Sequence, residues 1–252
     1  MWPSAPNKNV VTVGNNDEFN NSSHNYIMYC WHSVPGYSSF GSYTGTGTRV
    51  SNAGVTDFDG PFINCGFAPA FVMIKSTSAR GWYMYDNQRD THWPLRADES
   101  TQESQVNGGE LGWREIDFHS KGFKIRNNGN QTNQNETDIL YMAFADSSAL
   151  GELKTKSKKN PISINPKQGF KAVKYSGSSS TPLDVRGVGF KPDLTWVKST
   201  NEGWGHGLFS SLNTKGANGG HKYVWTNLTA EESDQWGAVK FDDEGWSGVG
   251  SS

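Results

Sequence analysis

The feature that most constrains the fold of this chain is an internal repeat. Residues 66–77 align with residues 189–200 without a gap, and six of the twelve aligned positions are identical. The same offset of 123 residues aligns residues 116–123 with residues 239–246. Two separate stretches that share one offset are not expected by chance, so the chain contains two copies of one structural unit.

Short apolar runs closed by turn residues indicate strands in both copies. These runs are rich in β-branched and aromatic residues, and no segment keeps a helical apolar stripe for three turns. Glycine contributes 29 of the 252 residues, and only 19 % of the residues are charged. We therefore predict an all-β fold of tandem, jelly-roll-like antiparallel β-sandwiches. The predicted strands are residues 10–13, 26–31, 71–74, 82–85, 139–144, 172–175, 194–197 and 223–226.

The repeat also sets the predicted domain boundaries. Residues 36–146 are predicted to form a complete sandwich, called the first copy below, and residues 168–252 form the second copy. Residues 147–167 hold five lysines and few strand signals, which predicts a basic linker between the copies. Residues 1–35 are predicted to be the terminal strands of a preceding repeat or donated strands.

A stretch near the start of the chain resembles the last strand of the first copy. The second copy is predicted to lack this strand. Residues 25–31 match residues 138–144, the last apolar strand of the first copy, at an offset of 113. We expect this strand to be added to the open sheet edge of the second copy, within the chain or in a neighbouring molecule. The alternative is that the chain is a piece of a longer tandem array with arbitrary ends. The expected assembly strand consists of Tyr26, Ile27, Met28, Tyr29, Cys30 and Trp31.

Composition and motifs argue against several classes of function. The 23 basic and 25 acidic residues are interspersed, so we expect no nucleic-acid partner. No apolar run approaches the length of a membrane span, so we expect no membrane insertion. The sequence holds no hydrolase, zinc-protease or nucleotide-binding motif, and we expect no catalytic residues and no cofactor.

Two kinds of carboxylate-rich stretch keep alternatives open. A polysaccharide hydrolase would have to use pairs such as Asp86 with Asp90 or Glu99 with Glu103. The runs at residues 57–60 and 242–245 could attract a hard cation. Their Asp and Gly residues are typical of turns, so we predict no metal site.

Aromatic side chains next to planar polar groups are the best candidates for a ligand site. Sugars stack on aromatic faces, while Asn, Asp and Arg side chains hydrogen-bond their hydroxyl groups. Because alternate residues of a strand point to opposite faces, about half of these aromatic residues are expected to fill the core. The predicted ligand-binding residues are Asp86, Arg89, His92, Trp93, Trp204, His206 and Trp225.

The chain has two cysteines, Cys30 and Cys65. Each lies in an apolar, strand-like run, which favours free and buried thiols. A single bridge between them is the alternative in an oxidising compartment.

Five stretches carry motifs that are specific in combination: residues 29–45, 59–62, 66–69, 141–145 and 187–198. Together they resemble a repeat domain of bacteriophage structural proteins, common in tail-fibre and virion-surface proteins of marine phages. The resemblance extends over residues 36–146 and 168–252. It implies a jelly-roll sandwich similar to concanavalin-like and SPRY domains, located on a virion surface and in contact with host-surface molecules.

These features lead to a functional prediction. We expect a non-enzymatic structural protein of a virion surface or another extracellular assembly, whose loops contact host glycans as an adhesin. Its expected partners are further copies of itself and a host-surface glycan. The main alternative is a filament or decoration subunit assembled by strand complementation, and a polysaccharide hydrolase is the third possibility.

Overall fold

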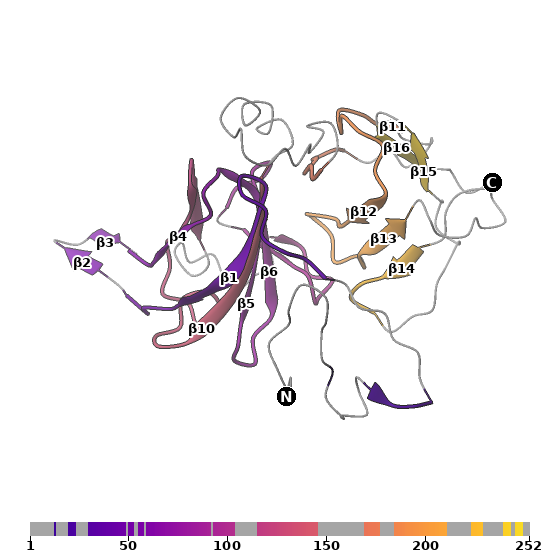
Figure 1. Cartoon of the computed structure of the whole chain (residues 1–252). Helices are drawn as coiled ribbons and strands as arrows, with labels where there is room; N and C mark the ends of the chain where they lie inside the picture. The colour runs from indigo at the N-terminus through magenta and orange to yellow at the C-terminus, as the bar shows by residue number, and fades with distance from the viewer. Residues whose placement is uncertain are drawn as a thin grey trace, which may run out of the picture. The chain divides into compact units, whose positions relative to one another are not determined.

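The computed structural model divides into two compact units, residues 1–32 and residues 33–252. Apart from two helical residues, Asn20 and Glu103, the described secondary structure consists of β-strands, and all of the strands lie in the second unit (Figure 1), which confirms the predicted all-β class. Within the described residues, no helix is long and apolar enough to span a membrane. The structure describes residues 13, 20–23, 30–48, 50–52, 55–57, 59–91, 93–103, 115–145, 169–176, 184–210, 223–228, 239–242 and 245–248.

The first copy contains a five-stranded antiparallel sheet. Its strand order is β1-β10-β5-β6-β7, and β5 lies between β10 and β6. β5 is apolar along most of its length because both of its faces are covered. The strands are β1 (Ser38–Thr44), β5 (Pro69–Ser76), β6 (Trp82–Asp86), β7 (Leu95–Arg96) and β10 (Asp138–Ala145).

A smaller sheet packs against one face of this large sheet. It consists of β4 (Phe62–Asn64), β9 (Gly122–Ile125) and β8 (Ile116–His119), in that order. The large sheet contributes alternate side chains to the shared core, and the small sheet contributes others. A separate hairpin is formed by β2 (Val50–Asn52) and β3 (Val55–Asp57). The fully or nearly fully buried core residues include Val72, Ile74, Tyr83, Tyr85, Ile116, Phe123 and Ile125.

The opposite face of the large sheet is also apolar. Met73, Met84 and Leu95 form a second buried cluster there, and Phe71 packs against it. The ring of Phe170, which follows the predicted linker, lies 5.2 Å from the ring of Phe71. Side chains therefore cover both faces of the large sheet around Phe71 and Met73.

The strands of the second copy recur at the offset of the sequence repeat. β15 (Val239–Asp242) and β16 (Gly245–Gly248) have the bounds of β8 and β9 shifted by 123 residues. Together with β11 (Asp184–Val185) they form a sheet ordered β11-β16-β15, which corresponds to β4-β9-β8.

The other sheet of the second copy has only three described strands. β12 (Leu194–Val197), β13 (Gly207–Ser210) and β14 (Tyr223–Trp225) lie side by side in that order (Figure 1). They correspond to β5, β6 and β7 of the first copy. The phenyl ring of Phe209 and the phenol ring of Tyr223 form the core of this sheet.

Most of the predicted strands are present, and one prediction is wrong. Residues 71–74, 82–85, 139–144 and 194–197 lie in strands, and residues 223–226 form a strand that ends at Trp225. Residues 172–175 form no strand. Their counterpart β1 is held by β10, whereas no described strand offers residues 172–175 such a partner. Residues 10–12, 24–29 and 146–168, which include most of two predicted strands and the predicted linker, lie outside the described residues; Val13, Cys30 and Trp31 are in no strand.

The two cysteines are free. The expected burial is wrong for Cys30, which is exposed because it lies in no strand that would hold its side chain against a core. Cys65 is half-buried after β4, and burial raises the pKa of its thiol to about 11.

Candidate functional site

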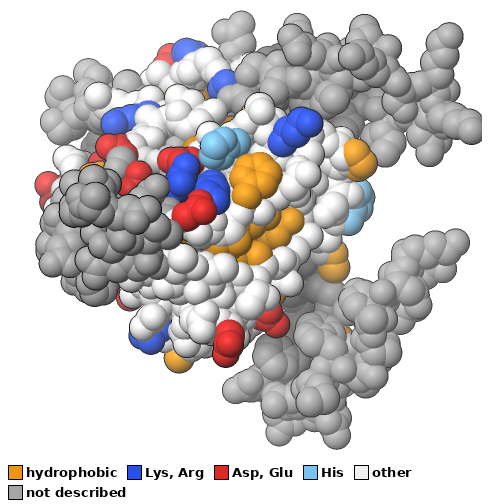
Figure 2. Space-filling view, turned by 90° about the vertical axis from the view of Figure 1, so that its left-hand side faces the viewer, with side chains coloured by type: hydrophobic (Ala, Val, Ile, Leu, Met, Phe, Trp, Pro, Cys, Tyr) orange, Lys and Arg blue, Asp and Glu red, His pale blue; other side chains and the backbone are white. Residues whose placement is uncertain are grey.

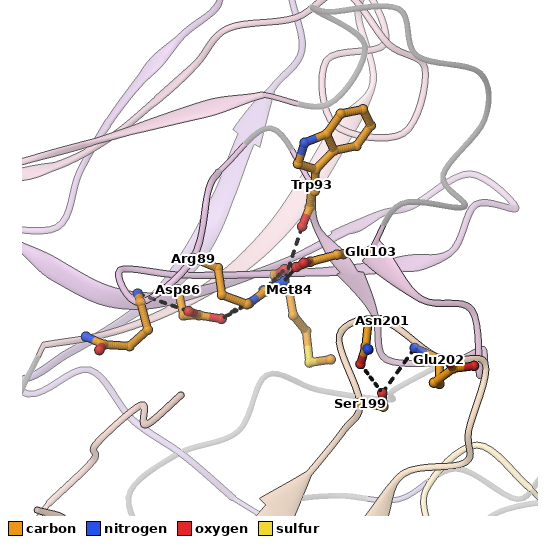
Figure 3. A network of polar contacts seen from close by, with 9 residues as sticks. Met84, Asp86, Arg89, Trp93, Glu103, Ser199, Asn201 and Glu202 are labelled. Carbon is orange, nitrogen blue, oxygen red and sulfur yellow. Dashed lines mark hydrogen bonds and ion pairs between the residues drawn. The ribbon is translucent and has the colours of Figure 1, made fainter. Parts of the chain in front are cut away.

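Arg89 is the centre of a polar cluster in the loop after β6 (Figure 3). Its guanidinium Nε donates a hydrogen bond of 2.8 Å to Oδ2 of Asp86, the last residue of β6. A second nitrogen lies 3.0 Å from Oε2 of Glu103 and donates a hydrogen bond of 3.2 Å to the carbonyl oxygen of Trp93. The other carboxylate oxygen of Asp86 accepts a hydrogen bond from the backbone N–H of Gln88.

The cluster holds the loop in place and leaves few hydrogen-bond donors of Arg89 available to a ligand. The side chain of Arg89 is only 5 % exposed, and protein oxygens occupy its donors on several sides. The structure therefore brings together the predicted residues Asp86, Arg89 and Trp93, with Trp93 contributing its backbone carbonyl to this contact. His92 lies outside the described residues.

A second group of predicted residues lies at the start of β13 and the end of β14. The carbonyl oxygen of His206 accepts a hydrogen bond from the N–H of Thr226, and its N–H donates one of 2.8 Å to Oδ1 of Asn227. Trp225 packs edge-on against Tyr223, and its ring covers Gly205 so closely that a Cβ there would lie 2.6 Å away. His206 and Trp225 thus fix the positions of two adjoining loops.

The imidazole of His206 is inaccessible to solvent. Burial, and next the positive charge of Lys198, lower its pKa to about 4, against a small opposing effect of the Glu99 backbone and the Asp98 charge. Burial and the charge of Arg89 also lower the pKa of Lys198 to about 8, and the Lys198 Nζ donates a hydrogen bond to the Glu99 carbonyl. His206 is therefore neutral near pH 7 and has no open path to a substrate.

Four positions on one face of the three-stranded sheet distinguish the two copies. Strand register makes Leu194, Trp196, Leu208 and Val224 the counterparts of Phe71, Met73, Met84 and Leu95. In the first copy, Met73, Met84 and Leu95 are each less than 10 % exposed. In the second copy, Leu194 is 61 %, Trp196 38 % and Val224 39 % exposed. We call the four residues of the second copy the apolar face.

The same sheet also has an open edge. In the first copy, β5 pairs with β6 on one side and β10 on the other. Within the described part of the chain, β12 pairs with β13 alone. The Oγ1 atom of Thr195, in the middle of β12, is buried without a hydrogen-bond partner in the structure. An edge strand presents a row of backbone N–H and C=O groups to which another strand can pair.

Charged side chains do not form a one-sign patch on the face seen in Figure 2. Acidic and basic groups adjoin one another there, beside a histidine and hydrophobic side chains. In the first copy, Lys124 lies 2.5 Å from Asp59, and Arg126 lies 2.6 Å from Asp117. Among the residues that the structure describes, no three His, Cys, Asp or Glu side chains gather to hold a metal ion.

The apolar face was not among the residues proposed from the sequence. Leu194 and Trp196 belong to an apolar strand, where the usual expectation is burial. The available signal was the offset of 123 residues, which pairs β12 with β5 but supplies no described counterpart of β10 beside it. Of the predicted ligand-binding residues that are described, Trp204 is the one with a largely exposed ring, at 60 %.

The fold and these surfaces define an all-β protein with repeated antiparallel sheets. The chain belongs to the family described as "Domain of unknown function (DUF7483)", whose model matches residues 1–148 and 165–252. The residues left out, 149–164, lie within the predicted linker. No curated protein and no solved structure matches the chain.

Proposed function

We propose that this protein is a non-enzymatic structural component of an extracellular or virion-surface assembly. It is built from two copies of a jelly-roll-like sandwich, and its second copy binds a partner through the apolar face. The observation that carries the proposal is that Met73 and Leu95 are buried in the first copy, whereas Trp196 and Val224 at the equivalent positions of the second copy are exposed. Contiguous exposed apolar side chains on a sheet are typical of interaction surfaces.

The apolar face is suited to protein contacts. Full burial of a large apolar side chain contributes roughly 1.5 to 3 kcal/mol. Leu194, Trp196 and Val224 retain much of this potential contribution because they remain largely or partly exposed. In the first copy, the corresponding positions lie in a buried cluster that includes Met73, Met84 and Leu95. A partner that covers the second copy would create an equivalent cluster.

The carboxylates of the described residues support a non-enzymatic role. Glycoside hydrolysis needs one carboxyl group with a raised pKa as general acid. Two pKa values are shifted downward instead: that of Asp59 by its hydrogen bond and charge interaction with Lys124, and that of Asp98 by Arg96 and the Trp82 N–H, which outweigh burial. Asp86 and Glu103 are both paired with Arg89.

The first test is the Leu194→Glu variant. A carboxylate in the middle of an apolar contact must be desolvated on association, so we expect self-association to weaken at least about tenfold. Leu140→Glu is the matched control, because Leu140 is also exposed but lies on β10 of the first copy. Sedimentation velocity over a wide range of protein concentration measures the effect. A wild-type chain that stays monomeric throughout, or equal behaviour of both variants, would contradict the proposal.

Adhesion to glycans is a second candidate function, supported by the surroundings of Trp204. The exposed indole follows a polar turn in which Ser199 Oγ donates a hydrogen bond to Asn201 Oδ1 and accepts one from the N–H of Glu202 (Figure 3). An exposed aromatic face in a loop that also carries amide and carboxylate side chains fits sugar binding. Trp204→Ala should abolish binding on a glycan array, whereas Trp82→Ala, which removes another exposed indole, should not. Equal loss in both variants, or no binding by the wild type, would count against adhesion.

A further inference from the structure

We infer that the open edge of β12 accepts residues 25–31 of a second copy of this chain as an added antiparallel strand. The inference deepens the proposed assembly function and rests on it. The site itself consists of described residues, Leu194 to Val197 with the apolar face beside them. The occupant is identified by its sequence.

The occupant resembles the strand that fills the equivalent site in the first copy. Residues 25–31 align with residues 138–144, which form β10, and both stretches place apolar or aromatic side chains at every position after the first, although no residue is identical. β10 inserts between β5 and β1 and pairs with both. Because β12 is the counterpart of β5, a strand with the residue pattern of β10 is the expected neighbour of β12.

The two sequence offsets together set the register of the added strand. In the first copy, Phe144 faces Phe71, Ala143 faces Val72 and Met142 faces Met73. Residues of β10 correspond to residues 113 positions earlier, and residues of β5 to residues 123 positions later. This places Trp31 opposite Leu194, Cys30 opposite Thr195 and Tyr29 opposite Trp196.

This register matches each side chain to its surroundings. Successive strand residues alternate between faces, so Tyr29 and Trp31 would cover Trp196 and Leu194 on the apolar face. Cys30 would point to the core side, where the hydroxyl of Thr195 is buried and lacks a hydrogen-bond partner. The small thiol takes the place of Ala143, which is fully buried in the first copy.

A second structural observation points to the same vacant position in the sheet. Residues 172–175 align with the later part of β1, yet they form no strand. In the first copy, β1 is attached to the large sheet only through β10. A strand added beside β12 would give residues 172–175 the partner that β1 has, and would complete the five-strand arrangement.

We infer a second molecule as the donor because Cys30 and Trp31 of the same chain lie in no strand. Residues 13–16 and 25–31 match residues 125–128 and 138–144, which lie at the end of the first copy. When residues 25–31 add to the second copy of another molecule, they take the place after β16 that β10 takes after β9 in the first copy. Such a contact joins unlike surfaces and produces rings or filaments.

The test is a disulfide between Cys30 and a cysteine introduced by Thr195→Cys in the full chain. Directly opposed residues in antiparallel strands have Cβ atoms about 4.5 to 5.5 Å apart, close enough for a bridge after a small adjustment. Mild oxidation should give a ladder of covalent oligomers that collapses on reduction. Mass spectrometry of mixed isotopically labelled and unlabelled chains should locate the bridge between Cys30 of one molecule and the introduced thiol at position 195 of another.

Two variants control the cross-link. Thr195→Cys combined with Cys30→Ser should give no ladder, which excludes bridging through Cys65. Val197→Cys places the thiol two residues further along the same face and should cross-link at least about fivefold less, because diagonal neighbours lie about 7 to 8 Å apart. Circular dichroism checks that each variant keeps its strand content.

The outcomes separate this inference from the proposed function. A bridge formed only within single molecules, equal cross-linking at position 197, or no cross-link at all would overturn the added-strand inference. If multimers then still dissociate in Leu194→Glu, assembly through the apolar face stands without the added strand. If the wild type forms no multimers, both fail.

Discussion

Replacing Gly122 by alanine should lower the free energy of unfolding of the first copy by about 3 kcal/mol. Gly122 begins β9 and faces Asn64 of β4. A Cβ at this position would overlap with the carbonyl oxygen of Ile63 and lie 3.1 Å from the Cα of Asn64. These are backbone atoms that no side-chain rotation can move, so β4 would have to separate from β9.

Urea or thermal unfolding followed by circular dichroism measures the effect of Gly122→Ala. A loss of this size corresponds to a decrease in Tm of about 10 °C for a domain of this length. Ser120→Ala is the control, because Ser120 is exposed in the same hairpin. If the two variants unfolded alike, β4 and β9 would not approach each other as closely as the structure shows.

Arg89→Ala should also cost about 3 kcal/mol of stability. The buried guanidinium compensates the carboxylates of Asp86 and Glu103, and its removal leaves both without their shared partner. Arg89→Lys should recover only part of the loss, since an ammonium group lacks the planar fork that reaches both carboxylates.

Chemical denaturation of both Arg89 variants measures how much this polar cluster contributes to the free energy of unfolding. Arg80→Ala removes an exposed arginine from the same copy and should change stability by no more than about 0.5 kcal/mol. A similarly small effect of Arg89→Ala would mean that the cluster does not hold the loop. Arg89 would then again be a candidate for ligand binding.

The strands and the recurrence of their bounds could be predicted because they depend on local patterns. The alternation of apolar residues and the turn residues between them placed residues 71–74, 82–85, 139–144 and 194–197 in strands. Residues 172–175 have the same local pattern and form no strand. Their prediction was wrong because a strand also needs a neighbour, which a local pattern does not contain.

The candidate site was harder to predict because the roles of its side chains depend on distant partners. The sequence marked Arg89 as a surface donor, but Glu103 lies fourteen positions away and closes the cluster over it. Asn127 and Asn133 are further examples, since asparagine is typical of exposed turns and both are fully buried here. The Nδ2 of Asn133 donates a hydrogen bond to the Asn127 carbonyl, and the Oδ1 of Asn133 accepts one from the N–H of Thr46.

The apolar face illustrates the limit of reasoning from the repeat. The offset of 123 residues assigns Trp196 to the position of Met73, which is buried. Burial at that position depends on side chains of other strands, such as Met142 of β10 and Leu95 of β7. A sequence comparison of the two copies therefore predicts the strand but not its exposure.

Hydrogen–deuterium exchange of the full chain at low and high protein concentration is the most direct test of an interface at β12. Peptides that contain Leu194 to Val197 should exchange more slowly as concentration rises, because added backbone hydrogen bonds protect edge amides. Peptides from β9, already paired with both β4 and β8, should not change. Formation of multimers without any added protection at β12 would contradict the role assigned to this edge.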